Sequence, residues 1–415
     1  MQRTHPLSLP VTGDPDAHLP AAVRVGGRVW LSGANALHAG DVPADAHAQA
    51  HLALDQLEVA LKSVGGSLAD LTKLTTCVID RGYRTAVYRA IAERVQTDAR
   101  PVSTGLVVAG LCDPSLVVQI DAEAWIGEGR RNIRPYDYDD WFGQGFAWHG
   151  SMVLVTPDEF FVRGQTGGAL DHSGQPVTGR TPDAARQLAH DGLANLRQLL
   201  EEAGGGLEDV ARINVYLADR RHRAAIYPEI GAAFGDIHPC STGVVTTAFA
   251  REDIVWEIDV IAPRRKDGAS HRRHRKYHSA TARYGTEVQP LDCKFCMSVQ
   301  AGGRIILRGQ TGMALDEQLV GPGDVVAQTE QAMDNVAQLL AEAGAGFGDV
   351  VKAVVYVTEG DFVGPVNRTL TARFGADLPA LTTVVVKGLA SPELLMEIDI
   401  TAMTPAGSGR PRRVN

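Results

Sequence analysis

The chain has 415 residues, 44% of them hydrophobic and 21% charged, and a formal net charge of −9. This length predicts two or three globular domains, and the acidic balance argues against nucleic acid as a general partner. No stretch approaches the about 18–20 apolar residues of a membrane span, and the first residues lack the apolar core of a signal peptide, so we expect a cytoplasmic protein without membrane contact.

Three stretches of the chain carry the same motifs in the same order. The first reads VWLSGANAL around Gly33, the second FFVRGQTGGAL around Gly164 and the third IILRGQTGMAL around Gly309. They end on the acidic alternating runs VVQIDAEA, VWEIDVIA and LMEIDITA. A spacing of roughly 130 to 145 residues is too long for a solenoid repeat and long enough for a domain with its own core. The sequence therefore predicts three like domains.

The third copy shows the elements of this repeat most clearly, through a change from strand-like to helix-like spacing of apolar residues. The expected order is strands 297–303 and 304–310, helix 324–343, strand 350–357, helix 362–375 and strands 381–389 and 394–403. The order β-β-α-β-α-β-β predicts an α+β fold with helices on one face of a mixed sheet. The first two copies have the same order.

These motifs divide the chain into domains and connecting segments. The expected division is domain one at 1–126, a linker at 127–147, domain two at 148–262, a basic linker at 263–292, domain three at 293–405 and a tail at 406–415. The basic linker is interpreted as a solvated segment that could also touch phosphates. The first linker is aromatic, and we expect it to pack onto the body of the protein.

Several ordered motifs of the chain resemble the RidA (YjgF-like) family of reactive-intermediate deaminases. They are GDVPADAHAQAHLALDQLEVAL in the first copy, AQTEQAMDNVAQLLAEAG and PVNRTLTARFG in the third, and the glycine and the (Q/E)-I-D signature in all three. The resemblance implies three RidA-like (chorismate-mutase-like) domains. It also implies a trimer with ligand clefts between neighbouring subunits, here built from one chain as a pseudo-trimeric ring with three unequal clefts.

The resemblance also implies an arginine on the penultimate strand that binds the substrate carboxylate. This chain has Ser103, Ser241 and Leu381 at the three matching positions, so the usual deamination of 2-imino acids is in doubt. Arg163 and Arg308 precede the signature glycine in the second and third copies, where the first keeps Ser32. Either arginine could hold an anion in the cleft, or pair with an acidic neighbour at the strand end.

A glutamate on the last strand is the catalytic residue that the resemblance implies. Its counterparts are Glu257 and Glu397 in the second and third copies, and Gln119 in the first. A half-buried carboxylate can act as general acid or base, whereas glutamine cannot transfer protons, so we expect the Gln119 cleft to be inert. A strand glutamate could also be only an ion-pair partner. The aspartates two residues further on are interpreted as structural groups on the opposite face of the strand.

The remaining candidates for substrate binding lie around these positions. A second-helix position that lines the family's cleft is Tyr88, Tyr227 or Asn367 in the three copies, and Phe295 stands where the family often has a cleft tyrosine. The third copy is our first candidate for the working cleft, with Phe295, Arg308, Gly309, Gln310, Asn367 and Glu397. The second copy offers Arg163, Gly164, Gln165, Tyr227, Ser241 and Glu257.

The cysteines give no clear metal or redox site. Cys293 and Cys296 have the spacing of a zinc or redox pair, but a zinc site needs two further ligands and no second pair matches. We expect no cofactor and no metal.

Taken together, the motifs favour an enzyme that acts on a small, anionic imine, enamine or related C=N compound. The reaction would be hydrolytic deamination or a related rearrangement, cyclisation or condensation in a specialised biosynthetic or catabolic pathway. The alternative is a non-catalytic small-molecule-binding protein. An endoribonuclease is disfavoured because the chain lacks a repeated basic or aromatic stacking surface. The partner expected is a small-molecule substrate, with the chain a monomeric pseudo-trimer whose further self-association the sequence leaves open.

Overall fold

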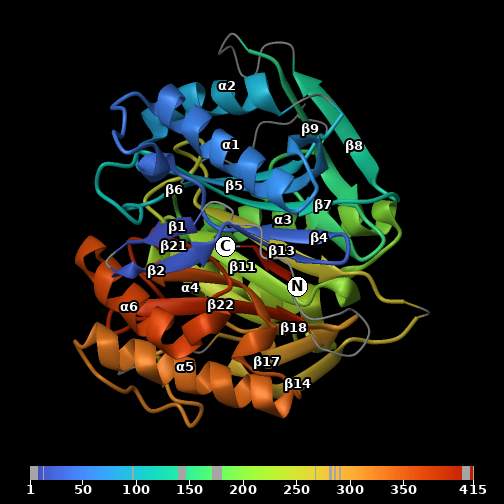
Figure 1. Cartoon of the computed structure of the whole chain (residues 1–415). Coiled ribbons are helices and arrows are strands. Elements are labelled where there is room, and N and C mark those ends of the chain that lie inside the picture. The colour runs from blue at the N-terminus through green and yellow to red at the C-terminus, as the bar shows by residue number, and fades with distance from the viewer. Residues whose placement is uncertain are drawn as a thin grey trace.

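The chain folds into three mixed β-sheets, each covered by two long helices (Figure 1). The computed structural model describes residues 8–12, 14–95, 98–138, 146–170, 180–266, 268–279, 283–284, 287–288, 291–403 and 412–414. In Figure 1, α1 and α2 lie along the top and α5 and α6 along the bottom, with strands between them. Within the described ranges, no helix combines the length and the apolarity needed to cross a bilayer.

The three domains repeat one order of elements, and the expected β-β-α-β-α-β-β series is present in each. Domain one holds β3 (Ala22–Val25), β4 (Arg28–Leu31), α1 (Ala46–Ser63), β5 (Leu71–Val78), α2 (Arg84–Arg94), β6 (Val102–Val107) and β7 (Val118–Trp125). Domain two holds β9 (Trp148–Val155), β10 (Glu159–Val162), α3 (Pro182–Ala203), β11 (Arg212–Leu217), α4 (Arg223–Phe234), β12 (Cys240–Val245) and β13 (Trp256–Pro263). Domain three holds β17 (Lys294–Ala301), β18 (Arg304–Leu307), β19 (Gln310–Thr311), α5 (Val325–Glu342), β20 (Val350–Val357), α6 (Val363–Phe374), β21 (Ala380–Val385) and β22 (Met396–Met403).

The segments expected to be linkers and a tail contribute strands. Strand β8 (Arg131–Tyr138) pairs with β9, β14 (Arg272–His278) with β17, and β23 (Arg412–Val414) with β3. The segment 263–292, expected to be a basic linker, thus contains the edge strand β14, whose backbone forms a sheet ladder and whose Tyr277 packs against the core. The sequence signal was weak because β14 is an edge strand with mostly exposed side chains.

The first helix of each domain begins at a side-chain cap and buries an apolar face on its sheet. Asp45 accepts a hydrogen bond from the Ala48 amide (2.8 Å) at the start of α1, and Asp324 accepts from Val326 (2.9 Å) at the start of α5. Such caps satisfy backbone donors that have no partner within the helix. The helix–sheet layers hold most of the hydrophobic core.

Charged residues on the inner faces of the sheets link the domains in cyclic order. Lys73 of domain one pairs with Asp259 of domain two, and Lys352 of domain three pairs with Asp121 of domain one. Between domains two and three, Arg212 lies 3.5 Å from an oxygen of Asp399. The three aspartates stand at matching positions, so one interaction is repeated at each domain boundary.

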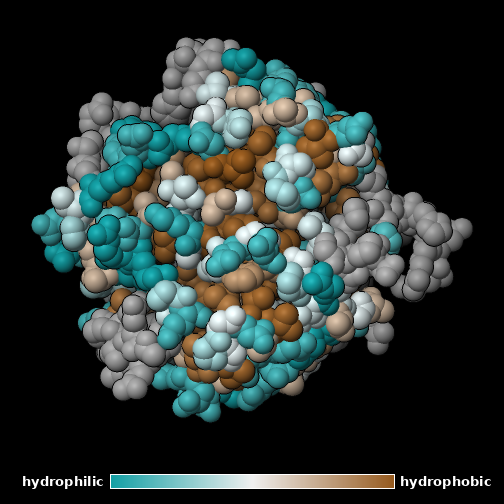
Figure 2. All heavy atoms as spheres, turned by 90° about the vertical axis from the view of Figure 1, so that its left-hand side faces the viewer, coloured by the Kyte–Doolittle hydropathy of each residue, from teal (hydrophilic) through white to brown (hydrophobic). Residues whose placement is uncertain are grey.

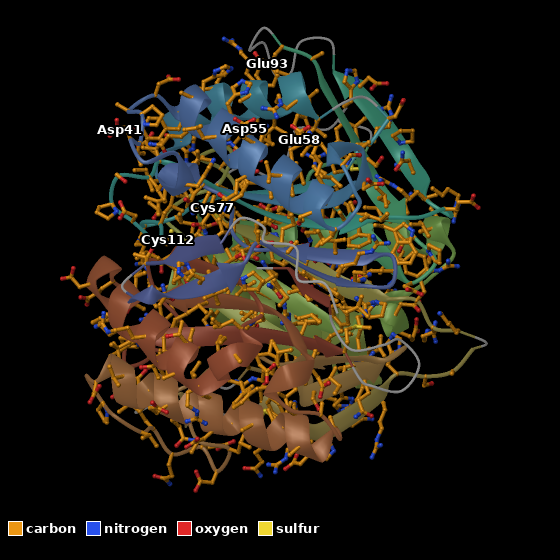
Figure 3. The ribbon with its side chains drawn as sticks, in the orientation of Figure 1. Asp41, Asp55, Glu58, Cys77, Glu93 and Cys112 are labelled. Atoms are coloured by element: carbon orange, nitrogen blue, oxygen red, sulfur yellow. The ribbon has the colours of Figure 1, made fainter. Side chains whose placement is uncertain are left out.

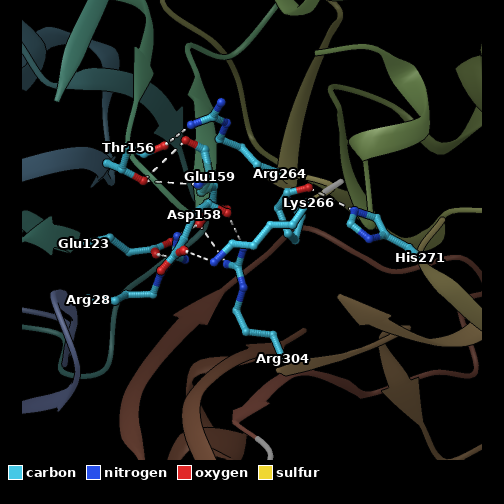
Figure 4. Close-up of polar contacts among 10 residues, drawn as sticks. Arg28, Glu123, Thr156, Asp158, Glu159, Arg264, Lys266, His271 and Arg304 are labelled. Atoms are coloured by element: carbon cyan, nitrogen blue, oxygen red, sulfur yellow. Dashed lines mark hydrogen bonds and ion pairs between the residues drawn. The ribbon is translucent and has the colours of Figure 1, made fainter. Parts of the chain in front are cut away.

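A buried Arg–Glu–Arg cluster joins the three domains at the start of β4, β10 and β18. Arg28, Glu159 and Arg304 occupy the matching first position of these strands, and each is less than 5% exposed. Arg304 donates to Glu159 Oε2 at 2.8 Å, and Arg28 forms an ion pair with the same carboxylate (Figure 4). Burial, followed by repulsion from Arg304, lowers the pKa of Arg28 to about 9. An exact homotrimer would bring three identical residues together here, whereas one chain can place an acid between two bases.

An N-terminal hairpin, formed by β1 (Ser8–Val11) and β2 (Asp14–Pro20), packs on domain three beside β21 and α6. On the adjoining face of the molecule, apolar residues gather at the centre and hydrophilic residues surround them (Figure 2). Strands β15 (Arg283–Tyr284) and β16 (Glu287–Val288) pair with each other in a separate two-stranded sheet.

Candidate functional site

Among the described residues, three clefts occupy matching places at the domain boundaries. We name them after the residue on the last strand: the Glu257 cleft between domains one and two, the Glu397 cleft between two and three, and the Gln119 cleft between three and one. Ser103, Ser241 and Leu381, where the resemblance would place an arginine, line these three clefts respectively.

The signature glycine lets an acidic side chain lie directly over the backbone. In the Glu257 cleft, a Cβ on Gly164 would overlap Glu257 Oε1, and in the Glu397 cleft a Cβ on Gly309 would overlap Glu397 Oε1. Because any other residue would displace the carboxylate, glycine and glutamate form one unit of the site. Both glutamates are about 5–6% exposed.

Burial makes both glutamates weak acids. Desolvation, reinforced by the charge of Asp259, raises the pKa of Glu257 to about 8. Desolvation and Asp399 raise the pKa of Glu397 to about 8 in the same way. Each group therefore carries a proton near neutral pH and can give it up, as a general acid or base requires.

Two arginines face Glu257 from opposite domains. Arg163 follows β10 of domain two, and Arg84 opens α2 of domain one. Their charges moderate the rise in the pKa of Glu257. Arg84 is buried, and among the described groups nothing accepts a hydrogen bond from its Nη1. Its guanidinium stacks on Tyr88 (4.8 Å to the ring centroid), and that of Arg163 stacks on Tyr136 (5.3 Å). The cleft thus presents two fixed cations beside one proton carrier.

The Glu397 cleft repeats this arrangement almost residue for residue. Arg308 follows β18 and stacks on Tyr277 (5.5 Å), and Arg223 opens α4 and stacks on Tyr227 (4.3 Å). Both charges act on Glu397. Ser241 and Phe295 complete the lining.

The two arginine clefts differ greatly in size, and their walls differ at a matched position on β9 and β17. The Glu257 cleft has a volume of about 420 Å³ and the Glu397 cleft about 30 Å³. Gly150 is paired with Tyr136 in the β8–β9 ladder as Phe295 is paired with Tyr277 in the β14–β17 ladder. The Phe295 ring is tilted against Tyr277 at 6.2 Å between centroids and meets Tyr227 edge-on at 6.4 Å. Beside Gly150, the side chains of Tyr136 and Trp148 lie close to the backbone instead.

The Gln119 cleft lacks every charged group of the other two. Gln119 donates to the Thr383 carbonyl (3.1 Å), and Ser32 donates to the Pro20 carbonyl (2.7 Å). Asn367 donates to the carbonyl of Thr12 in the N-terminal hairpin (3.0 Å). Leu9, Thr12 and Leu19 of that hairpin line the cleft, whose volume is about 50 Å³. The hydrogen bonds from Ser32 and Asn367 hold the N-terminal hairpin in place.

The set proposed for the third copy is divided between two clefts. Phe295, Arg308 and Glu397 lie in the Glu397 cleft, but Asn367 lies in the Gln119 cleft. The reason is that α6 faces the following domain, whereas the glycine and the last strand face the preceding one. Gln310 and Gln165 hold the strand ends by donating to the carbonyls of Arg308 (2.6 Å) and Arg163 (2.7 Å).

The expectation that the aspartates lie on the opposite face from the glutamates is wrong. Glu257 and Asp259 share a face, because side chains two residues apart on a strand point the same way. The intervening Ile258 points into the hydrophobic core. The aspartates therefore influence the glutamates directly, in addition to pairing with Lys73, Arg212 and Lys352.

Cys77, Cys240, Cys293 and Cys296 are buried, and Cys112 is half-buried beside the Gln119 cleft. Cys293 donates to the Tyr227 carbonyl (2.8 Å), and Cys296 lies 3.8 Å from Cys240, not beside Cys293.

Sequence reasoning missed Arg84 and Arg223, although a signal was present. Both stand four residues before the cleft tyrosine, on the same helix face, and Val363 replaces them before Asn367. The strand that follows this helix (β6, β12 or β21) differs between the copies in a matching way. Gly105 and Gly243 leave room for the tyrosine hydroxyl and the guanidinium, while the third copy has Thr383 there.

Comparisons with known proteins agree with this fold and repeat. The family model described as "Endoribonuclease L-PSP" matches residues 13–126, 153–263 and 289–404. The 2-iminobutanoate/2-iminopropanoate deaminase of Escherichia coli K12 is 34% identical over 112 residues, which are 26% of this chain and 86% of that protein. The mouse deaminase of the same name is 32% identical over 95 residues, 23% of this chain and 70% of that protein. Each such relative therefore corresponds to one domain.

A solved structure extends over most of the chain. A chorismatase crystal structure covers 80% of this chain and 93% of its own, with a TM-score of 0.52 and 18% identity, and supports the fold alone. The architecture is that of α+β domains repeated in tandem with clefts at their boundaries. The chain belongs to the RidA/YjgF family, in which it carries three copies of the family domain.

Proposed function

We propose that the chain is an enzyme that acts on a small anionic imine, enamine or related C=N compound in the Glu257 cleft. The observation that carries this proposal is a single constellation: a proton-carrying glutamate, two arginines from different domains and about 420 Å³ of space. Family relatives described as imine deaminases support the reaction class. The three domains would act as a pseudo-trimer, so that one chain supplies the clefts that subunits supply elsewhere.

The geometry suggests a division of labour in hydrolysis. Arg84 and Arg163 would bind the substrate's anionic group through charge-assisted hydrogen bonds. Protonated Glu257 would give its proton to the imine nitrogen, and the resulting carboxylate would take a proton from the water that attacks the imine carbon. The tetrahedral adduct would then expel ammonia and leave a carbonyl product. Loss of the family's usual arginine favours a specialised pathway, with the anion held from a different wall.

A non-catalytic binding protein is the competing function, because a buried protonated glutamate can also accept ligands without turnover. The test supplies 2-imino acids generated in place from amino acids by an amino-acid oxidase, and follows their loss with a semicarbazide trap. We expect Glu257→Gln to lower kcat by about 100-fold or more. Arg84→Ala should chiefly raise KM, because it removes an anchor of the ground state as well as the transition state.

The matched control is Glu397→Gln, which alters the same motif in the narrow cleft and should leave the rate within about twofold. Equal turnover by Glu257→Gln and the wild type would exclude the proposed acid–base role. Retained binding of a 2-oxo acid with no turnover of any imine or enamine tried would favour the binding protein. Cleavage of RNA that survives Glu257→Gln would favour the endoribonuclease alternative.

A further inference from the structure

We propose that His47, His51 and Glu93 form a binding site for a divalent transition metal, with Zn²⁺ as the probe of choice. The site lies on the outer helical layer of domain one, away from the three clefts, and departs from the expectation that the chain has no metal site. Figure 3 shows Glu93 on α2, above Asp55 and Glu58 of the adjacent α1.

The helical spacing brings the two imidazoles to one place. His47 and His51 are four residues apart on α1, so they project from the same face one turn apart. Their rings are 4.6 Å apart between centroids. Histidines at this spacing on a helix are a recurrent zinc-binding arrangement.

The carboxylate of Glu93 completes a convergent set of three donors. Oε2 of Glu93 lies 3.0 Å from His47 Nε2 and 2.8 Å from His51 Nε2, and all candidate ligand atoms lie within 4.8 Å of one another. Ligand atoms around tetrahedral zinc are separated by about 3.3 Å, given metal–ligand bonds of about 2.0–2.1 Å. Only small side-chain rotations would admit the ion.

The charge and exposure of the cluster also suit a metal. The neighbouring cation Arg94 is directed toward Asp55 and Glu58, at 2.7 Å each. The three side chains are 29–46% exposed, so an ion can enter and a water molecule can take the fourth position.

The test titrates the intact chain, freed of metal by chelator, with Zn²⁺ in a calorimeter, and repeats the titration with Co²⁺ to follow the visible spectrum. We expect one Zn²⁺ per chain, with affinity lowered at least tenfold by His47→Gln, His51→Gln or Glu93→Gln. His190→Gln is the matched control, because His190 lies on another outer helix near one carboxylate, Glu229 (3.4 Å), without a second histidine. The His190→Gln variant should bind Zn²⁺ with the same affinity as the wild type.

The proposal is overturned if the double variant His47→Gln/His51→Gln binds Zn²⁺ with wild-type stoichiometry and affinity, or if the wild type shows no binding at 100-fold molar excess. Circular dichroism of each variant checks that α1 is intact. These outcomes are independent of catalysis, since turnover in the Glu257 cleft is not measured.

Discussion

At the residue scale, the two arginine clefts share a glutamate that lies over a glycine. Glu257 and Glu397 have the same environment: burial, an aspartate two residues later, one arginine from the same domain and one from the preceding domain. Gln119 is the natural counterexample, because an amide at the same position is hydrogen-bonded into a closed cleft. One functional group therefore separates clefts that can carry a proton from one that cannot.

This environment predicts how stability depends on pH. The folded chain keeps a proton on each glutamate up to about pH 8, whereas the unfolded chain loses it near the ordinary value of 4.5. Between these values the folded state binds more protons, so the free energy of unfolding should fall as pH rises. Denaturant unfolding at pH 5 and pH 8 measures this fall in the free energy of unfolding. In the double variant Glu257→Gln/Glu397→Gln the fall should be smaller than in the wild type by about 2 kcal/mol or more. A decline identical to that of the wild type would contradict the raised pKa values.

At the scale of elements, two homologous strands decide which cleft is open. Strands β9 and β17 have the same neighbours and the same register, but β9 has Gly150 where β17 has Phe295. The wall of the cleft thus differs between the two copies, with Tyr136 and Trp148 beside Gly150 in one and the Phe295 ring in the other. The α2 and α4 helices add the matching arginine and tyrosine on the other wall, while α6 does not.

We expect Phe295→Gly to open the Glu397 cleft as a second site and Gly150→Phe to close the first. A Cβ at position 150 would lie 2.7 Å from the Tyr136 hydroxyl and 3.1 Å from Trp148 Nε1, so a phenyl ring has no free space there. Calorimetry with a small 2-oxo acid should give one site per chain for the wild type, two for Phe295→Gly and none for Gly150→Phe. A single site in Phe295→Gly would show that this ring does not block the cleft.

At the scale of the whole molecule, one chain breaks the symmetry that identical subunits would impose. The cluster of Arg28, Glu159 and Arg304 shows this in charge, and the hairpin in the Gln119 cleft shows it in shape. Two clefts keep arginines and a glutamate, and the third serves to hold the N-terminal hairpin.

The buried cluster predicts a large stability effect of one substitution. Glu159→Gln removes the carboxylate that two buried guanidinium groups share, leaving Arg28 only the longer pair with Glu123 (3.6 Å), and should lower the free energy of unfolding by about 3–5 kcal/mol. Glu252→Gln is the control, because Glu252 is 82% exposed beside Arg81 and should change stability by less than about 0.5 kcal/mol. Replacing all three cluster residues with Met should recover much of the loss. If Glu159→Gln is as stable as its control, Glu159 does not hold the domains together.

The sequence by itself determined the repeat, the α+β class and the residues on the last strands. These properties depend on local periodicity and on motifs that recur within one chain, so no tertiary contact is needed to see them. It also placed Glu257, Glu397, Arg163 and Arg308 in clefts, through the resemblance to the family.

Only the tertiary structure decided which residues meet. Asn367 lies in a different cleft from Glu397, whereas Arg84 and Arg223 lie in the clefts of the two glutamates. The reason is that each cleft has one wall from each of two domains. The size of each cleft could not be predicted from the sequence either. It depends on how the ring side chains of neighbouring strands pack at the domain boundary. The physical reason is the same in each case: these properties arise from packing between segments distant along the chain, and local sequence patterns do not encode such packing.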